Sequence, residues 1–314
     1  MATTNSPRTP TGPHPSRQHQ GRPVPLAVWP VGQRSAQYQR AGRYLPACTA
    51  HPGKMLPELA HRIISEYSRP GQLVVDPMAG TGTTLVEAAL AGRRAIGVEL
   101  EARWAELAQA NADHVLGPDA GRLVEVRRGD AAKLADLLGD DAGRVDLVCT
   151  SPPYACDVGN LDTANWEAGH NLCSTGERNY STDRANLGHA RGAAYESAMA
   201  DIYTACLAVL RPGGILAVVT KNTRRKGRTL DLAGLTVALA EQAGFTYLQH
   251  VVALHAAVRE GDLVARPSFW QRTQTQKAAA RGDAAHLVVH EDLCVFSAGP
   301  AQLASTTKED PRAN

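Results

Sequence analysis

The sequence predicts an α/β fold: a mostly parallel, seven-stranded sheet with helices on both faces. Two patterns indicate it, namely short apolar runs that alternate with longer amphipathic segments, and glycine-containing turns between them. Hydrophobic residues make up 43% of the 314 residues, which suffices for a sizeable core. In such sheets, ligands bind at the carboxyl ends of the strands. We therefore expect the functional residues in the loops that follow the strands.

The expected helices are segments in which apolar residues recur at helical spacing. The first, at residues 56–68, ends before Pro70-Gly71, a pair that stops a helix. The others are expected at residues 83–91, 103–116, 195–210 and 230–242. Arg-Pro-Gly-Gly at residues 211–214 ends the helix at 195–210, because proline and glycine interrupt helical hydrogen bonding.

The expected strands are short apolar runs bounded by turns or helices. They lie at residues 72–75, 95–98, 123–127, 145–150, 215–220, 246–254 and 287–296. Strands that alternate with helices pair in parallel, because each crossover returns the chain to the same end of the sheet. The carboxyl ends of most of these strands should therefore share one edge.

The two ends of the chain differ from this pattern. Residues 1–40 are rich in Pro, Arg, Gln and Ser and contain no acidic residue, which predicts a disordered, mildly basic arm, either a solvated tail or a segment that contacts DNA. Residues 301–314 predict a second loose tail. A single folded domain is expected at residues 41–300. The start of the chain has no apolar signal core, so a cytoplasmic protein is expected.

The cysteine pattern and the net charge bear on two kinds of site, metal sites and nucleic-acid contacts. The six cysteines form no Cys-x-x-Cys pair and no Cys/His cluster of the zinc type, which fits a reducing compartment and predicts no metal site. The net charge is only +2, so contact with nucleic acid must rest on local basic patches. One such patch follows the strand at 215–220, where five basic residues are expected to bind phosphates: Lys221, Arg224, Arg225, Lys226 and Arg228.

A glycine turn follows the first strand. Residues 76–84 read Asp-Pro-Met-Ala-Gly-Thr-Gly-Thr-Thr, and the glycines allow a tight turn that a ligand can approach closely. The Gly-Lys-Ser/Thr ending of a phosphate loop is missing. Glu99 and Asp130 end the next two strands, as Asp76 ends the first. Three acids around one glycine turn predict a pocket that binds adenosine without a phosphate.

A rigid tetrapeptide follows the strand at 145–150. It reads Ser151-Pro152-Pro153-Tyr154, and its two prolines fix φ and remove two amide donors. The result is an extended backbone that presents carbonyl oxygens, a hydroxyl group and an aromatic ring at the edge where ligands bind. A diproline can merely end a strand, but that role does not account for the tyrosine.

Together, the turn at 76–84 and the tetrapeptide at 151–154 resemble the S-adenosylmethionine-dependent DNA amino-methyltransferases, which methylate N4 of cytosine or N6 of adenine. Four further segments are similar to that family: His51 to Lys54, Gly92 to Glu99, Arg211 to Gly214 and His290 to Phe296. With them, the resemblance covers roughly residues 44–298. The resemblance implies a Rossmann-like methyltransferase fold and S-adenosylmethionine as cofactor.

The resemblance also implies a role for each matched residue. Asp76, Gly80 and Gly82 would line the methionine end of the cofactor, Glu99 would hold the ribose, and Asp130 the adenine amino group. The other residues expected around the cofactor are His51, Ala79, Thr81 and Thr83. Ser151 and the Pro152 carbonyl would accept hydrogen bonds from the target amine, Pro153 completes the rigid backbone, and Tyr154 would stack on the flipped base.

Serine in the tetrapeptide is associated within this family with N4-cytosine methylation, so the leading expectation is N4-cytosine methylation of DNA with an extruded base. N6-adenine methylation, guanine-N2 methylation of RNA, and a non-catalytic module that binds DNA or cofactor remain open. Residues 155–192 and 257–285 are candidate target-recognition loops. Both are shorter than a separate recognition domain, which leaves a short target, an unusual substrate, a helper subunit or a cognate restriction enzyme open.

Overall fold

The structure is a computed structural model that describes residues 25–51, 53–153, 186–187, 190, 192–225, 228–267, 269–282 and 286–299. Residues 1–24 of the expected arm, the tail at 301–314 and most of the first candidate loop at 155–192 lie outside the described residues.

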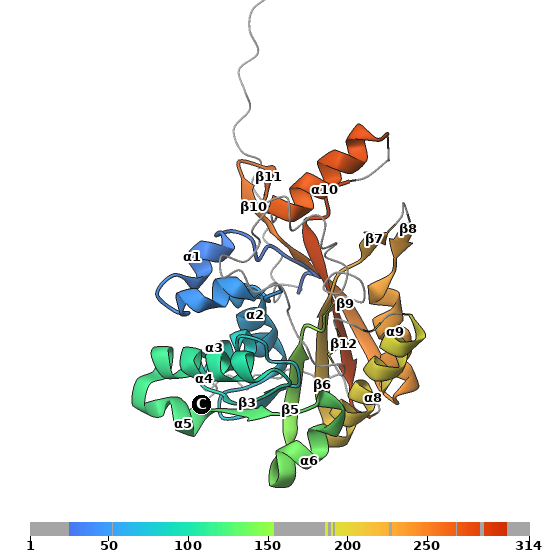
Figure 1. Ribbon diagram of the computed structural model, residues 1–314. Helices are drawn as coiled ribbons and strands as arrows, with labels where there is room; N and C mark the ends of the chain where they lie inside the picture. The colour runs from blue at the N-terminus through green and yellow to red at the C-terminus, as the bar shows by residue number, and fades with distance from the viewer. Residues whose placement is uncertain are drawn as a thin grey trace, which may run out of the picture.

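A mixed sheet of eight strands forms the centre of the fold, in the order β1-β9-β12-β6-β5-β2-β3-β4 (Figure 1). β12 is antiparallel to both of its neighbours, and every other adjacent pair is parallel. The strands are β1 (Val28–Trp29), β2 (Leu73–Asp76), β3 (Arg94–Glu99), β4 (Val124–Arg128), β5 (Val145–Thr150), β6 (Leu210–Thr220), β9 (Thr246–Leu254) and β12 (His290–Ser297).

Helices cover both faces of the sheet (Figure 1). The α-helices are α1 (Ala36–Arg40), α2 (Pro57–Tyr67), α3 (Thr83–Leu90), α4 (Ala102–Leu116), α5 (Ala120–Leu123), α6 (Leu134–Leu138), α8 (Ala193–Val209), α9 (Leu232–Gln242) and α10 (Phe269–Ala280). Short 3-10 turns are η1 (Pro46–Ala50), η2 (Gly117–Asp119), η3 (Ala131–Lys133) and η4 (Gly139–Asp141). No helix among the described ranges has both the length and the apolar content needed to cross a membrane.

Two apolar cores stabilise the sheet, one on each face. Buried side chains of α2, α3 and α4, such as Leu59, Leu85 and Ala108, pack against one face. Side chains of α6, α8 and α9, such as Leu134 and Met199, pack against the other. Adjacent residues of a strand point to opposite faces, so strands buried on both sides are apolar throughout.

The expected fold is confirmed, with one added strand. All seven expected strands are present, and the five expected helices shift by only one or two residues at their ends. Residues 211–214 do interrupt the helix, but the chain is already extended there, because β6 begins at Leu210. The eighth strand, β1, pairs in parallel with β9 at one edge of the sheet.

The expectation of a disordered arm through residue 40 is wrong for residues 25–40. These residues form β1 and α1, with Trp29 and Val31 buried. The buried amide of Gln39 donates to the Val31 carbonyl (3.0 Å) and accepts from the Glu58 backbone N–H (3.0 Å). Composition averaged over the whole arm concealed the short apolar run at residues 26–31, which supplies the edge strand.

The N-terminal segment, residues 25–51, is fastened to α3 through a buried carboxylate. The Glu87 side chain is fully buried and accepts hydrogen bonds from the Tyr44 hydroxyl (2.8 Å) and from Arg43 Nη2 (2.8 Å). Arg40 donates to the hydroxyl of Thr83, the first residue of α3 (3.3 Å). A buried charge is tolerated only with such partners, so the segment and α3 stabilise each other.

Replacing Tyr44 tests this attachment. Tyr44→Phe removes the hydrogen bond to the buried Glu87 carboxylate and should lower the free energy of unfolding by about 1–3 kcal/mol. Tyr38→Phe is the matched control, because Tyr38 is 58% exposed, and it should change stability by less than about 0.5 kcal/mol. Urea denaturation measures both. Equal stability of the two variants would show that the Glu87 contact does not hold the segment.

Candidate functional site

Three of the expected site residues lie at the ends of adjacent strands. Asp76 ends β2, Glu99 ends β3, and Ser151 follows β5, with β2 between the other two strands. Val75 pairs with Val148, so Asp76 lies one residue beyond that pair and Ser151 three residues beyond it. Because the strands are parallel, these side chains share one edge of the sheet, which we call the active edge.

Asp76 begins the glycine turn and shapes it. Its Oδ1 accepts the Met78 N–H (3.1 Å) and its Oδ2 accepts the Thr84 hydroxyl (2.7 Å). Burial raises the pKa of Asp76 to about 6. Gly80 and Gly82 have φ values of 52° and 79°, a left-handed conformation that glycine adopts without strain. The turn therefore has the shape that its two glycines predicted.

Glu99 closes the turn from the next strand. The buried carboxylate accepts the Gly80 N–H at Oε2 (2.8 Å) and the Glu101 N–H at Oε1 (2.9 Å). Burial raises the pKa of Glu99. A carboxylate oxygen can accept two hydrogen bonds, so Glu99 can hold the turn and still accept a hydrogen bond from a hydroxyl group of a ligand.

His51 covers the turn. A Cβ atom placed on Gly80 would lie 3.3 Å from His51 Nε2, so the ring and the turn are in close contact. The ring also meets Trp104 edge-on, with centroids 4.7 Å apart. Burial lowers the pKa of His51 to about 3, so the imidazole is neutral at physiological pH. An uncharged imidazole ring therefore packs beside the turn.

Three further residues of the turn, Ala79, Thr81 and Thr83, are buried, and each is hydrogen-bonded to another part of the chain. Ala79 donates its N–H to the Val98 carbonyl (2.9 Å). The Thr81 carbonyl accepts from Asn111 Nδ2 (2.8 Å), and Thr83 accepts from Arg40. These contacts stabilise the turn from β3, from α4 and from the N-terminal segment.

Asp130 lies at the active edge, one strand beyond Glu99. Its carboxylate caps η3 by accepting the Ala132 N–H (3.0 Å). The Gly129 N–H donates to the Glu99 backbone carbonyl (3.0 Å), which ties the end of β4 to the end of β3. Of the three acids expected around the turn, Asp76 and Glu99 thus end β2 and β3, and Asp130 lies two residues beyond the end of β4, the next strand of the sheet.

The start of the tetrapeptide is anchored from α8. Pro152 is buried, whereas Ser151 and Pro153 are partly exposed. The buried Tyr195 donates its hydroxyl to the Pro153 carbonyl (3.1 Å), which fixes the direction of the chain after Ser151. Tyr154 lies outside the described residues.

The expected basic patch follows β6 at the active edge. Lys221 comes directly after β6, and its Nζ lies 3.5 Å from the Val288 carbonyl oxygen. Arg224 and Arg225 belong to β7 (Thr223–Arg225), and Arg228 begins the antiparallel β8 (Arg228–Leu230). The side chains of these three arginines, and Lys226 as a whole, lie outside the described part of the chain.

Three supporting residues were missed in the sequence. Asn111 joins the turn to the N-terminal segment, because its Oδ1 also accepts the Leu45 N–H (2.9 Å). Its signal was available, since Asn111 is a polar residue on the stripe that also contains Trp104, Ala108 and Ala112. Arg40 and Tyr195 carried no comparable signal.

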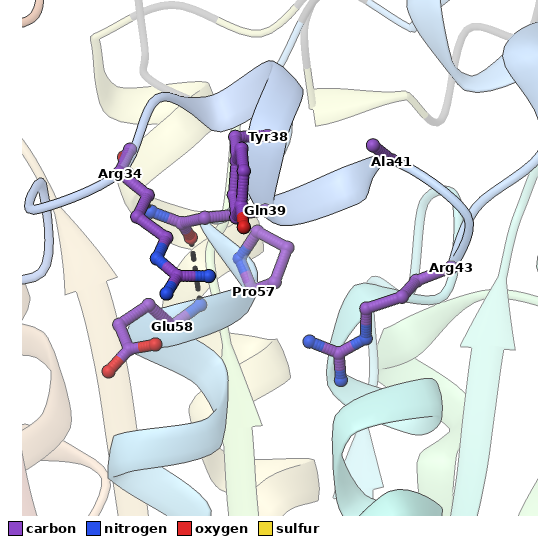
Figure 2. Close-up of a pocket in the computed structure, with 7 residues that line it drawn as sticks. All are labelled: Arg34, Tyr38, Gln39, Ala41, Arg43, Pro57 and Glu58. Carbon is purple, nitrogen blue, oxygen red and sulfur yellow. Dashed lines mark hydrogen bonds between the residues drawn. The ribbon is translucent and has the colours of Figure 1, made fainter.

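A hollow of about 490 Å³ lies apart from the active edge, between α1 and the start of α2 (Figure 2). The dashed line in Figure 2 is the hydrogen bond from the Glu58 backbone N–H to the Gln39 side chain, and both residues line the hollow. None of the expected site residues lines it; its walls are Arg34, Tyr38, Gln39, Ala41, Arg43, Pro57 and Glu58.

Several curated proteins match parts of the chain. A tRNA (guanine(10)-N2)-dimethyltransferase of Methanocaldococcus jannaschii is 35% identical over 106 residues, 33% of this chain and 30% of that protein. Type II methyltransferase M.MthZI of Methanothermobacter thermautotrophicus is 46% identical over 59 residues, 19% of this chain and 17% of that protein. DNA adenine methyltransferase YhdJ of Escherichia coli is 27% identical over 122 residues, 39% of each protein. The chain therefore spans less than half the length of each of these relatives.

Among solved structures, geranyl diphosphate methyltransferase aligns over 77% of this chain and 79% of its own, with a TM-score of 0.46 and 14% identity. A family model described as DNA methylase matches residues 3–110. That segment contains His51, the turn that follows Asp76, and Glu99. The match covers about a third of the chain, so residues 3–110 are similar to the DNA methylase family.

Proposed function

We propose that the protein transfers a methyl group from S-adenosylmethionine to the exocyclic N4 amine of cytosine in DNA. The observation that carries this proposal is the position of Ser151 and its diproline beside Asp76, on the strand next to the glycine turn. A cofactor at the turn and a base at Ser151 would then meet at one edge. Holding methyl donor and acceptor in line can contribute about 7–11 kcal/mol.

The residues at the turn fit S-adenosylmethionine. The turn at 76–84 contains no lysine or arginine, as suits a ligand without phosphate, and its left-handed glycines let a ligand approach the backbone. Glu99 would accept hydrogen bonds from the ribose hydroxyls, and Asp130 from the adenine amino group. Asp76 would face the charged methionine end. When bound, the cofactor supplies an electrophilic methyl group.

The residues after β5 would prepare the target amine. An exocyclic base amine is a weak nucleophile, because its lone pair is delocalised into the ring. If its two N–H groups donate hydrogen bonds to the Ser151 oxygen and the Pro152 carbonyl, the nitrogen becomes more tetrahedral. Its lone pair is then less delocalised into the ring and can attack the methyl group. Tyr195 keeps this backbone in place through Pro153.

Bringing the base to Ser151 requires that it leave the duplex, at a cost of a few kcal/mol. Stacking on Tyr154 would return about 1–3 kcal/mol of this. Phosphate contacts from the basic patch at residues 221–228 would supply the remainder.

Two other substrates follow from the relatives. The similarity to YhdJ favours N6 of adenine in DNA, and the similarity to the tRNA dimethyltransferase favours N2 of guanine in RNA. Purified protein, labelled S-adenosylmethionine and either genomic DNA or tRNA, followed by mass spectrometry of the nucleosides, distinguishes the three. N4-methylcytosine in DNA is the expected product, and label confined to adenine or to tRNA contradicts the proposal.

Ser151→Ala should lower the methylation rate about 10²-fold, because one acceptor for the amine protons is lost. Cofactor affinity should stay within twofold, since Ser151 does not belong to the turn. Ser65→Ala, at an exposed position of α2, is the matched control and should keep full activity. An unchanged rate in Ser151→Ala would remove Ser151 from the proposed catalytic site, whereas no methylation by the wild type itself would favour a non-catalytic binding module.

Asp76→Asn should separate stability from cofactor binding. The folded pKa of Asp76 is about 6 against an ordinary 3.8, so the charged form destabilises the folded state. Relative to the variant, the wild type should therefore lose stability as the pH rises from about 4 to about 6 and stay constant above, as urea denaturation at several pH values will show. Calorimetry should find cofactor binding at least tenfold weaker in the variant, because the charge that faces the methionine end is gone.

Asp113→Asn controls for the loss of a carboxylate, because Asp113 is exposed on α4. It should show neither effect. Cofactor binding of wild-type strength in Asp76→Asn would remove Asp76 from the proposed site.

A further inference from the structure

Residues 255–289 join β9 to β12 at the active edge. Leu254, the end of β9, pairs with His290, the start of β12, and Asp292 pairs with Thr220, the end of β6. β6 is parallel to β5, so its end lies at the same edge as Ser151. The described part of this insertion consists mainly of a hairpin, β10 (Ala256–Arg259) and β11 (Asp262–Ala265), followed by α10. Figure 1 shows the hairpin, α10 and the β7–β8 pair beyond the same end of the sheet.

The base of the insertion is fixed to the N-terminal segment. Arg259 donates to the side chain and the backbone carbonyl of Gln33 (2.8 and 3.0 Å), and Arg266 donates to the Gly32 carbonyl (2.8 Å). A Cβ atom on Gly32 would lie 2.4 Å from the Ala256 nitrogen, so only glycine permits this approach. These two arginines therefore serve the structure, and they hold the hairpin that leads into α10.

α10 is a polar helix with positive charge and no acidic side chain. Residues 271–277 are all polar, and residues 269–282 include no acid. Arg272, Gln276 and Lys277 are exposed, and α10 is not among the element pairs of the described chain that pack closely. A helix of 12 residues that lacks an apolar stripe gains little from the core. Its positive charge is complementary to nucleic acid.

We propose that α10 enters the major groove of duplex DNA beside the methylated base, with Arg272 and Lys277 on phosphates and Gln276 against a base edge. The proposal rests on the proposed function, because it names the element that would read the substrate. With its side chains, a helix is about 10–12 Å wide and fits the B-DNA major groove, about 12 Å wide. The deep, narrow major groove of an RNA helix excludes it, which favours DNA over RNA.

A double variant tests the phosphate contacts. Arg272→Gln with Lys277→Gln should bind a fluorescent DNA duplex at least tenfold more weakly near about 0.1 M salt. The slope of log affinity against log salt should fall by about 2, because two phosphate contacts are lost. The matched control, Arg69→Gln with Arg144→Gln, removes two exposed charges just before β2 and β5, at the opposite edge of the sheet, and should bind as the wild type does. Fluorescence anisotropy measures binding, and circular dichroism checks that every variant is folded.

Gln276→Ala tests the base contact. It should leave affinity for DNA of unrelated sequence within twofold, but change which sequences are methylated, as sequencing of methylated DNA will show. An unchanged set of sites removes Gln276 from the proposal. If the folded double variant binds DNA as tightly as the wild type, the proposed groove contact is contradicted. If it loses affinity only for a tRNA transcript, the partner of α10 is RNA and not DNA.

The binding assay needs no methyl transfer, so the two proposals fail separately. DNA binding that depends on Arg272 and Lys277, without any methylation of DNA, supports the α10 contact and contradicts the proposed function. If the double variant methylates DNA and binds it with wild-type affinity, the proposed α10 contact is contradicted and the proposed function is not.

Discussion

The hydrogen bond from the Gly80 backbone to the Glu99 carboxylate is the interaction on which the active edge depends. It joins the turn after β2 to the end of β3 at a partly buried position, and an unmade hydrogen bond at a fully buried position costs about 1–3 kcal/mol. Asp76 fixes the start of the same turn through Met78 and Thr84. The two buried acids therefore set the shape of the turn, and the pKa of each is raised by that burial.

The turn is also held from outside the sheet. Asn111 donates to its backbone, the His51 ring lies beside Gly80, and Arg40 donates to Thr83 at its far end. All three contacts depend on the N-terminal segment, because Asn111 also receives the Leu45 amide. Glu87 binds that segment to α3, the helix that follows the turn. Loosening the segment would therefore remove contacts from the turn.

The order of the strands divides the active edge into two halves around β5. β2, β3 and β4 carry the acids Asp76, Glu99 and Asp130 on one side. On the other side, β6, β9 and β12 carry the basic patch and the insertion with α10. Ser151 follows the strand between these halves. This arrangement suits a reaction that joins a cofactor on one side to a nucleic acid on the other, as proposed for this protein.

The sequence by itself determined the seven principal strands and the acids at their ends, because apolar periodicity and turn residues are local properties. The glycine turn was equally predictable, since its conformation depends on Gly80 and Gly82 themselves. Only the tertiary structure decided that residues 25–40 are ordered and that Arg40, Asn111 and Tyr195 support the site. Their partners lie far away in the chain, Thr83 for Arg40 and Pro153 for Tyr195, and no local pattern encodes such a contact.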